Sequence, residues 1–91
     1  MAQIIKTNGQ ILEVQPKNGT DFQLEEMQAI VNGYIEMVPL HNGEIMIVNE
    51  EGKFTCSENY TATFVAKHYN AITNDDYIFG DVLICKDEEM R

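Results

Sequence analysis

Two Asn-Gly pairs, each set between short runs of strand-favouring residues, are the feature that most limits the folds open to this chain. Asn8-Gly9 and Asn42-Gly43 are dipeptides preferred in tight hairpin turns, because Asn and Gly tolerate the positive φ that such turns need. A two-residue Asn8-Gly9 loop would place Ile5 opposite Leu12 as an apolar cross-strand pair for the core. The sequence therefore predicts two β-hairpins. The strands expected to form them are residues 3–7 and 10–14, and residues 34–38 and 44–48.

An amphipathic helix is expected between the two hairpins. Thr20 is a suitable N-cap, and Gln23 follows three residues later, as a capping box requires. The pair Asn32-Gly33 then supplies a left-handed stop. The apolar stripe of this helix would consist of residues that recur at helical spacing, namely Leu24, Met27, Ile30 and Val31.

The second half of the chain is expected to contain a buried strand and a second helix. Residues 45–48 are apolar at four successive positions, which is typical of a central strand covered on both faces. Residues 49–53 are polar and should form a solvated turn. Residues 54–70 suit either helix or strand, and the length of the segment favours a helix capped by Ser57.

The last part of the chain should complete the sheet. Residues 74–76 are expected to form a turn, and residues 77–79 and 82–85 a strand pair, or one strand bent at the intervening glycine. Residues 86–91 form a charged tail that is expected to fray. The order ββ-α-ββ-α-β predicts an α+β fold, with a mainly antiparallel sheet and helices packed on it, in a single domain over residues 1–91.

The cysteine content and the N-terminus indicate a cytoplasmic protein. Cys56 and Cys85 are the only cysteines, whereas a secreted domain of this size usually carries a denser disulfide framework. The chain begins directly with a strand-like pattern and lacks the cationic start and apolar stretch of a signal peptide. No apolar run approaches the length that spans a bilayer.

Histidine and cysteine give little support to catalysis or metal binding. His41 and His68 lack the spacing of a zinc site. Across a two-residue turn His41 would pair with Glu44, and His68 is expected on a helix surface. Cys85 ends an apolar strand and should be a small core residue, whereas Cys56 would need a cationic neighbour or a helix N-terminus to become a nucleophile.

Three aspartates lie close together in sequence near the last turn. Asp75, Asp76 and Asp81 could act as acid and base or hold a hard cation. Their spacing is not that of a calcium loop, and turn formation accounts for them. We therefore assign no catalytic, cofactor-binding or metal-binding residue. We expect a protein without a cofactor, and a non-catalytic role is favoured over an enzymatic one.

Several segments resemble a known family. They are residues 11–16 (Ile-Leu-Glu-Val-Gln-Pro), 24–28 (Leu-Glu-Glu-Met-Gln), 33–36 (Gly-Tyr-Ile-Glu), 49–53 (Asn-Glu-Glu-Gly-Lys) and 80–84 (Gly-Asp-Val-Leu-Ile). Together they resemble an uncharacterised family of small domains encoded by gut bacteria, phages and mobile elements. The resemblance implies a genomic setting and no established activity.

The strongest functional feature of the sequence is its net charge of −9, from 15 acidic and 6 basic residues. Such a charge repels phosphate backbones and anionic membranes, so we expect no direct binding to nucleic acid or membrane. The negative charge is more compatible with a protein partner, which could have a basic surface. The acidic residues that could form an interaction surface are Asp21, Glu25, Glu36, Glu44, Glu50 and Glu51.

Three functions remain open from the sequence. The first is a non-catalytic protein-binding or regulatory domain of a bacterial mobile element or phage. The second is an acidic DNA mimic that inhibits a host defence or DNA-handling enzyme, which requires a continuous acidic stripe. The third is a small hydrolase or ligand-binding enzyme, which requires a cleft with a strongly perturbed carboxylate.

Overall fold

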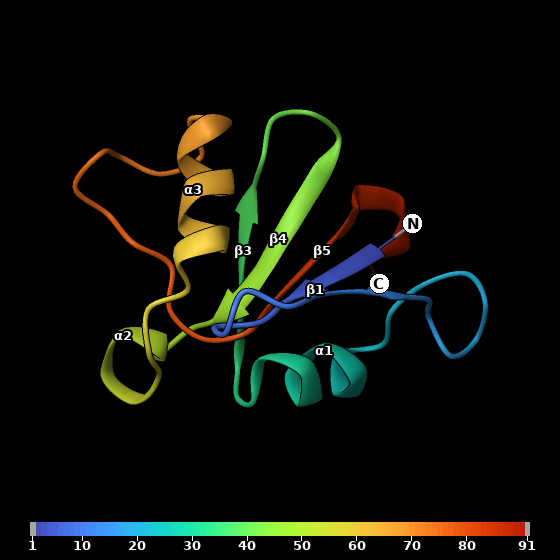
Figure 1. Cartoon of the computed structure of the whole chain (residues 1–91). Coiled ribbons are helices and arrows are strands. Elements are labelled where there is room, and N and C mark those ends of the chain that lie inside the picture. Colours follow the sequence, from blue (N-terminus) through green and yellow to red (C-terminus); the bar gives the residue numbers. More distant parts are fainter. Residues whose placement is uncertain (1, 91) are drawn as a thin grey trace.

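A computed structural model of the chain describes residues 2–90 and contains one five-stranded sheet (Figure 1). Every neighbouring pair of strands is antiparallel, and the order across the sheet is β2-β1-β5-β4-β3. The α+β fold class and the antiparallel sheet are therefore confirmed. The strands are β1 (Ala2–Ile5), β2 (Ile11–Val14), β3 (Ile35–Pro39), β4 (Glu44–Asn49) and β5 (Val82–Lys86).

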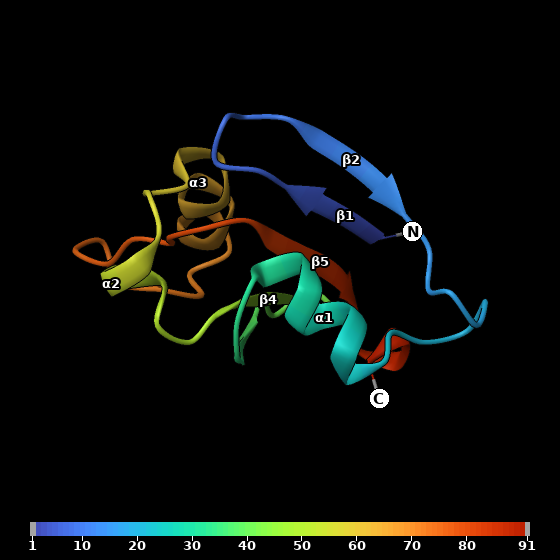
Figure 2. The same cartoon turned by 90° about the horizontal axis from the view of Figure 1, so that it is seen from below.

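Helices cover both faces of the sheet, as the view from below shows (Figure 2). One face is covered by α1 (Leu24–Val31), and α3 (Tyr60–His68) lies on the other face. The short helix α2 (Gly52–Thr55) lies beside the sheet, and the 3₁₀ helix η1 (Asp87–Glu89) follows β5. Because successive side chains of a strand point to opposite faces, Met46 and Val48 pack in the α3 layer while Ile47 packs in the α1 layer. The expected central strand with two covered faces is thus confirmed as β4. Within residues 2–90, no helix is both long enough and apolar enough to cross a membrane.

The first hairpin differs from expectation by one residue of register. Ile5 lies opposite Ile11, and the expected pairing of Ile5 with Leu12 is wrong. The loop contains three residues, and its last residue, Gly9, has a φ of 90°. In such a loop the side chain of Asn8 accepts a backbone N–H at 2.9 Å, and a single positive-φ residue suffices.

The second hairpin shows the same shift. The N–H of Leu40 donates to the carbonyl of Glu44 at 3.0 Å, so the loop runs over the three residues 41–43. His41 adopts a φ of 66° inside this loop. The expected pairing of His41 with Glu44 across the turn is therefore wrong, and the side chain of Asn42 bonds the Glu44 carboxylate at 3.1 Å instead.

The first helix begins three residues later than Thr20 would require. The N-cap is Gln23, whose N–H donates to the Glu26 carboxylate at 3.1 Å, while Thr20 belongs to a turn organised by the side chain of Asn18. The expected left-handed stop is confirmed, since Asn32 has a φ of 64°. Two residues of the apolar stripe are fully buried, Met27 and Val31. Leu24 is 46 % exposed.

Residues 54–70 do contain the expected helix, but with another cap. The helix α3 begins at Tyr60, and the Oδ1 of Asn59 accepts the N–H of Ala62 at 3.0 Å. Ser57 is therefore not the cap. The preceding segment is less solvated than expected, because Asn49 is buried and Gly52 already begins α2.

The C-terminal part contributes one strand. Residues 77–79 form no strand, and Phe79 makes only an isolated bridge with Glu58. Residues 86–91 were expected to fray, but Lys86 ends β5 and Asp87–Glu89 form η1, and the N–H of Phe22 donates to the Glu89 carbonyl at 2.7 Å. Arg91, at the end of that expected tail, lies outside the described residues.

Candidate functional site

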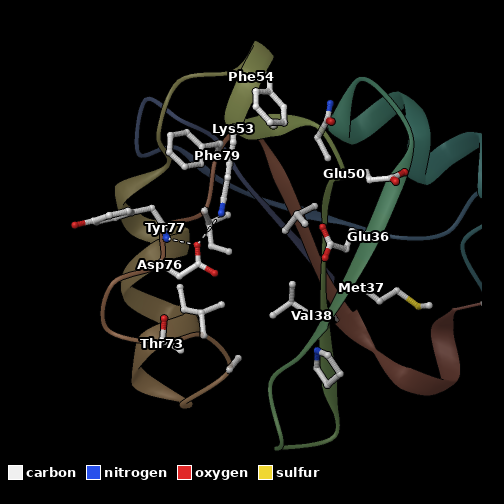
Figure 3. Close-up of a pocket in the computed structure, with 17 residues that line it drawn as sticks. Glu36, Met37, Val38, Glu50, Lys53, Phe54, Thr73, Asp76, Tyr77 and Phe79 are labelled. Atoms are coloured by element: carbon white, nitrogen blue, oxygen red, sulfur yellow. Dashed lines mark hydrogen bonds and ion pairs between the residues drawn. The ribbon is translucent and has the colours of Figure 1, made fainter.

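A groove of about 540 Å³ runs along the edge strand β3, on the face of the sheet that carries α3 (Figure 3). Its floor is apolar and includes Val38, Val48 and Ile78, which belong to or pack against the core beneath α3. We call it the β3 groove. It is lined by residues 36–39, 48–50, 52–54, 71–73 and 76–79.

One end of the β3 groove is fixed by a buried asparagine. The side-chain N–H₂ of Asn49, at the end of β4, donates to the carbonyls of Val31 and Asn32 at 3.0 and 3.2 Å. Its oxygen accepts the N–H of Glu51 at 2.8 Å. These three bonds tie the end of α1 to the turn that leads into α2, because a buried amide is stable only when its donors and acceptor are bonded.

A close backbone contact then sets the position of α2. A Cβ on Gly52 would lie 2.8 Å from the carbonyl oxygen of Phe79, so only glycine allows this approach. With α2 held there, the side chain of Phe54 stands 86 % exposed at the rim of the β3 groove (Figure 3).

The opposite wall, residues 71–79, is attached to α3. The N–H of Ile78 donates to the Thr63 hydroxyl at 2.8 Å. Lys67 donates to the carbonyl of Asn74 at 2.9 Å, and its ammonium lies 4.5 Å from the centroid of the Tyr77 ring. These contacts hold an irregular segment in place beside the sheet, and the ring of Tyr77, 46 % exposed, points away from β3 (Figure 3).

The β3 groove is acidic. Asp76 forms an ion pair with Lys53 at 3.3 Å and also accepts the N–H of Tyr77 at 2.8 Å. Glu36 projects from β3 toward this pair, and Glu50 lies nearer α2 (Figure 3). Three carboxylates and one ammonium give the groove a net charge of −2.

The three aspartates near the last turn do not meet at this site. Only Asp76 lines the β3 groove. Asp81 accepts the N–H of Thr7 at 3.0 Å and lies 4.0 Å from the ammonium of Lys6, on the β1 side of the sheet, while Asp75 is exposed in its turn. Over residues 2–90, no three His, Cys, Asp or Glu side chains are grouped so that they could hold a metal ion.

The histidine and cysteine candidates also lie elsewhere. His68 is exposed on α3, as expected, and its ring lies 4.9 Å from that of Tyr69. Cys56 is half-buried in a separate hollow near the end of α1. Cys85 is buried, as expected; burial and the nearby Glu89 raise the pKa of its thiol to about 11, which disfavours the reactive thiolate.

The six acidic residues expected at an interaction surface are distributed over both faces of the molecule. Glu36 and Glu50 line the β3 groove. Glu25 lies on α1, across the sheet, and Glu44 lies at the far end of β4. The remaining two are Asp21, ahead of α1, and Glu51, ahead of α2.

Sequence reasoning missed the aromatic rim of the site. Phe54 lies in a polar stretch at the start of a segment expected to be helical, and nothing in its spacing indicates that it stays exposed. Tyr77 and Phe79 were expected in a strand. An isolated aromatic residue directly after the Gly-Lys of a polar turn is the one signal that could have identified Phe54.

The comparisons with known proteins give a family. A family model described as Domain of unknown function (DUF3846) matches residues 3–91, nearly the whole chain. No curated protein and no solved structure matches the chain. The match confirms the resemblance to an uncharacterised family, while the expected origin in gut bacteria, phages or mobile elements stays a prediction.

Proposed function

We propose that this chain, which belongs to the DUF3846 family of domains of unknown function, is a non-catalytic protein-binding domain whose contact surface is the β3 groove. The observation that carries the proposal is Phe54, held 86 % exposed at the rim of a preformed groove. A large apolar side chain fixed in this position gains stability only when another surface covers it.

The area around Phe54 extends this apolar contact. Phe79 is half-buried and lines the same end of the groove, whereas Met37 projects from β3 to the other face of the sheet (Figure 3). Full burial of a phenylalanine side chain contributes about 1.5–3 kcal/mol. A partner that covers Phe54 therefore gains enough free energy to offset part of the cost of association.

The chemistry of the β3 groove favours binding over catalysis. Its charged side chains are the Lys53–Asp76 ion pair, Glu36 and Glu50. The two histidines and two cysteines lie outside it. The groove carboxylates could act as general bases, but among residues 2–90 neither a histidine nor a cysteine stands beside them as the nucleophile or second acid–base group of a catalytic set.

A DNA-mimic role receives less support from the acidic side chains. Glu25 and Glu36 lie on opposite faces of the sheet, whereas a mimic presents its carboxylates along one face. We further propose that the chain is encoded by a mobile element or phage and acts in the cytoplasm of a bacterium. The free thiols of Cys56 and Cys85 fit such a reducing compartment.

Photo-cross-linking tests the proposal. A benzoylphenylalanine introduced at position 54 would be irradiated in cells that express the chain, with position 64 as the matched control. Phe64 is a similarly exposed phenylalanine, 70 % exposed on α3, and does not line the β3 groove. We expect discrete cross-linked proteins from position 54 and none of the same proteins from position 64. Identical products from both positions, or none from position 54, would contradict the proposal.

A further inference from the structure

We infer that the occupant of the β3 groove is an extended basic segment of a partner protein, which adds antiparallel to β3 as a sixth strand and places a Lys or Arg side chain opposite Glu36. This inference rests on the proposed protein-binding function and specifies the chemistry of the partner. It follows from the hydrogen-bond register of β3, the direction of its side chains and the charge of the groove.

The register of the β3–β4 ladder can be read from its two ends. At one end the N–H of Glu50 donates to the carbonyl of Tyr34 at 2.9 Å, and at the other the N–H of Leu40 donates to the carbonyl of Glu44 at 3.0 Å. Hydrogen-bonded and non-hydrogen-bonded pairs alternate along an antiparallel ladder. The β3 residues whose backbone groups point toward β4 are therefore the even-numbered ones, from 34 to 40.

The odd-numbered residues of β3 point their backbone groups to the open edge of the sheet. Ile35 and Met37 each present an N–H and a carbonyl there, and Pro39 presents a carbonyl alone. Proline therefore ends the stretch that can accept another strand. An added antiparallel segment would bond Ile35 and Met37, which limits the contact to a short run of residues.

The same alternation decides which side chains meet. Val38 packs against the core beneath α3, so Glu36, two residues away, also faces the β3 groove (Figure 3). In the added strand the residue opposite Glu36 would form a non-hydrogen-bonded pair with it, the arrangement in which cross-strand side chains come closest. The residue two positions earlier in the added strand would lie opposite Val38.

The charge of the site then selects the side chain opposite Glu36. Lys53 is already paired with Asp76, whereas Glu36 and Glu50 leave the β3 groove net negative, in a chain of charge −9. A cation at this position is attracted and an anion is repelled. The apolar surface of Val38 favours an apolar side chain two residues earlier. The pattern expected in the partner is thus apolar-x-Lys/Arg in an extended segment.

A phage-displayed library of random ten-residue peptides, selected on the full chain, tests this inference. We expect the enriched peptides to carry the apolar-x-Lys/Arg pattern, and we would measure the binding of a synthetic copy by fluorescence anisotropy. Glu36→Lys should weaken that binding at least about fivefold, because an attraction becomes a repulsion. Glu25→Lys makes the same change of charge on α1, across the sheet, and should leave the affinity within about twofold.

A second variant tests strand addition itself. Met37→Pro removes the outward N–H at an edge position of the kind that Pro39 already occupies, and it leaves the bonds from β3 to β4 in place. With the fold verified by circular dichroism, we expect peptide binding to be lost. The inference would be overturned by enriched peptides that lack a cation. It would also be overturned by peptides that bind the Met37→Pro and Glu36→Lys variants as tightly as the parent chain. In either case the proposed function still stands if Phe54→Ser abolishes the binding of these peptides. Failure of the proposed function is distinguished by the absence of both enriched peptides and cross-links at position 54.

Discussion

Replacement of Asn59 by alanine should destabilise this domain more than any change of an exposed asparagine. Asn59 is fully buried where α3, β1 and the last turn meet. Its side-chain N–H₂ donates to the carbonyls of Ile5 and Gly80, both at 2.9 Å, and its oxygen caps α3 by accepting the N–H of Ala62. One side chain thus joins three segments that are distant in sequence.

The expected cost follows from these three bonds. Loss of an N-cap side chain costs about 1 kcal/mol. Each carbonyl left without its buried donor costs about 1 kcal/mol or more. The sum of about 3 kcal/mol is a large fraction of the 5–15 kcal/mol by which domains of this kind are stable. For a chain of this length it should lower Tm by at least about 12 °C.

Urea unfolding followed by circular dichroism would measure this loss in the free energy of unfolding. Asn8→Ala is the control, because Asn8 accepts a single N–H in an exposed loop and its loss should cost no more than about 1 kcal/mol. Asn59→Asp separates the two roles, since a carboxylate can still cap α3 but cannot donate to the two carbonyls. An Asn59→Ala cost below about 1 kcal/mol, or an Asn59→Asp variant as stable as the parent, would refute the reasoning.

Two further predictions concern the buried thiol and the glycine beneath Phe79. The pKa of Cys85 is raised from 9.0 to about 11, so over this range the folded state keeps a thiol proton that the unfolded state loses. The free energy of unfolding should therefore fall as pH rises from 9.0 to about 11, and Cys85→Ala should lack this part of the pH dependence. Equal pH slopes in the two proteins would contradict the assignment. Replacing a glycine inside a helix by alanine usually stabilises a protein by about 0.5–1 kcal/mol. Gly52→Ala should instead destabilise the domain, because the new Cβ would lie 2.8 Å from the Phe79 carbonyl oxygen. A rise in Tm on thermal unfolding would contradict this close contact.

The sequence predicted the elements better than it predicted their ends. The apolar run at 45–48 identified β4 because four successive apolar residues, following a hairpin turn, are typical of a strand with two covered faces. The Asn-Gly pairs correctly placed both hairpins. They did not distinguish two-residue from three-residue loops, since Gly9 and Gly43 satisfy the positive φ of either loop.

Helix caps were mispredicted for a related reason. Thr20 and Ser57 are good caps in isolation, but Gln23 and Asn59 hold the N-cap positions. Asn59 is selected by two carbonyls that come from β1 and from the turn at Gly80, and neither neighbour is visible in the local sequence.

The candidate site was only half predictable. Glu36 and Glu50 were recognised as acidic residues suited to contact a partner, because charge is read directly from the sequence. Their union with Phe54 and Tyr77 depends on how α2 and residues 71–79 pack beside β3. That packing is irregular, and no periodic pattern encodes it.

Residue-resolved amide hydrogen exchange of the full chain, with and without the peptide selected on it, tests the central claim most directly. In the free chain the N–H groups of Ile35 and Met37 point to the open edge and should exchange fast, while those of Glu36 and Val38 are protected by β4. The account predicts that the peptide slows exchange at Ile35 and Met37 and leaves Glu36 and Val38 protected as before. Unchanged fast exchange at Ile35 and Met37 in the saturated complex would contradict it.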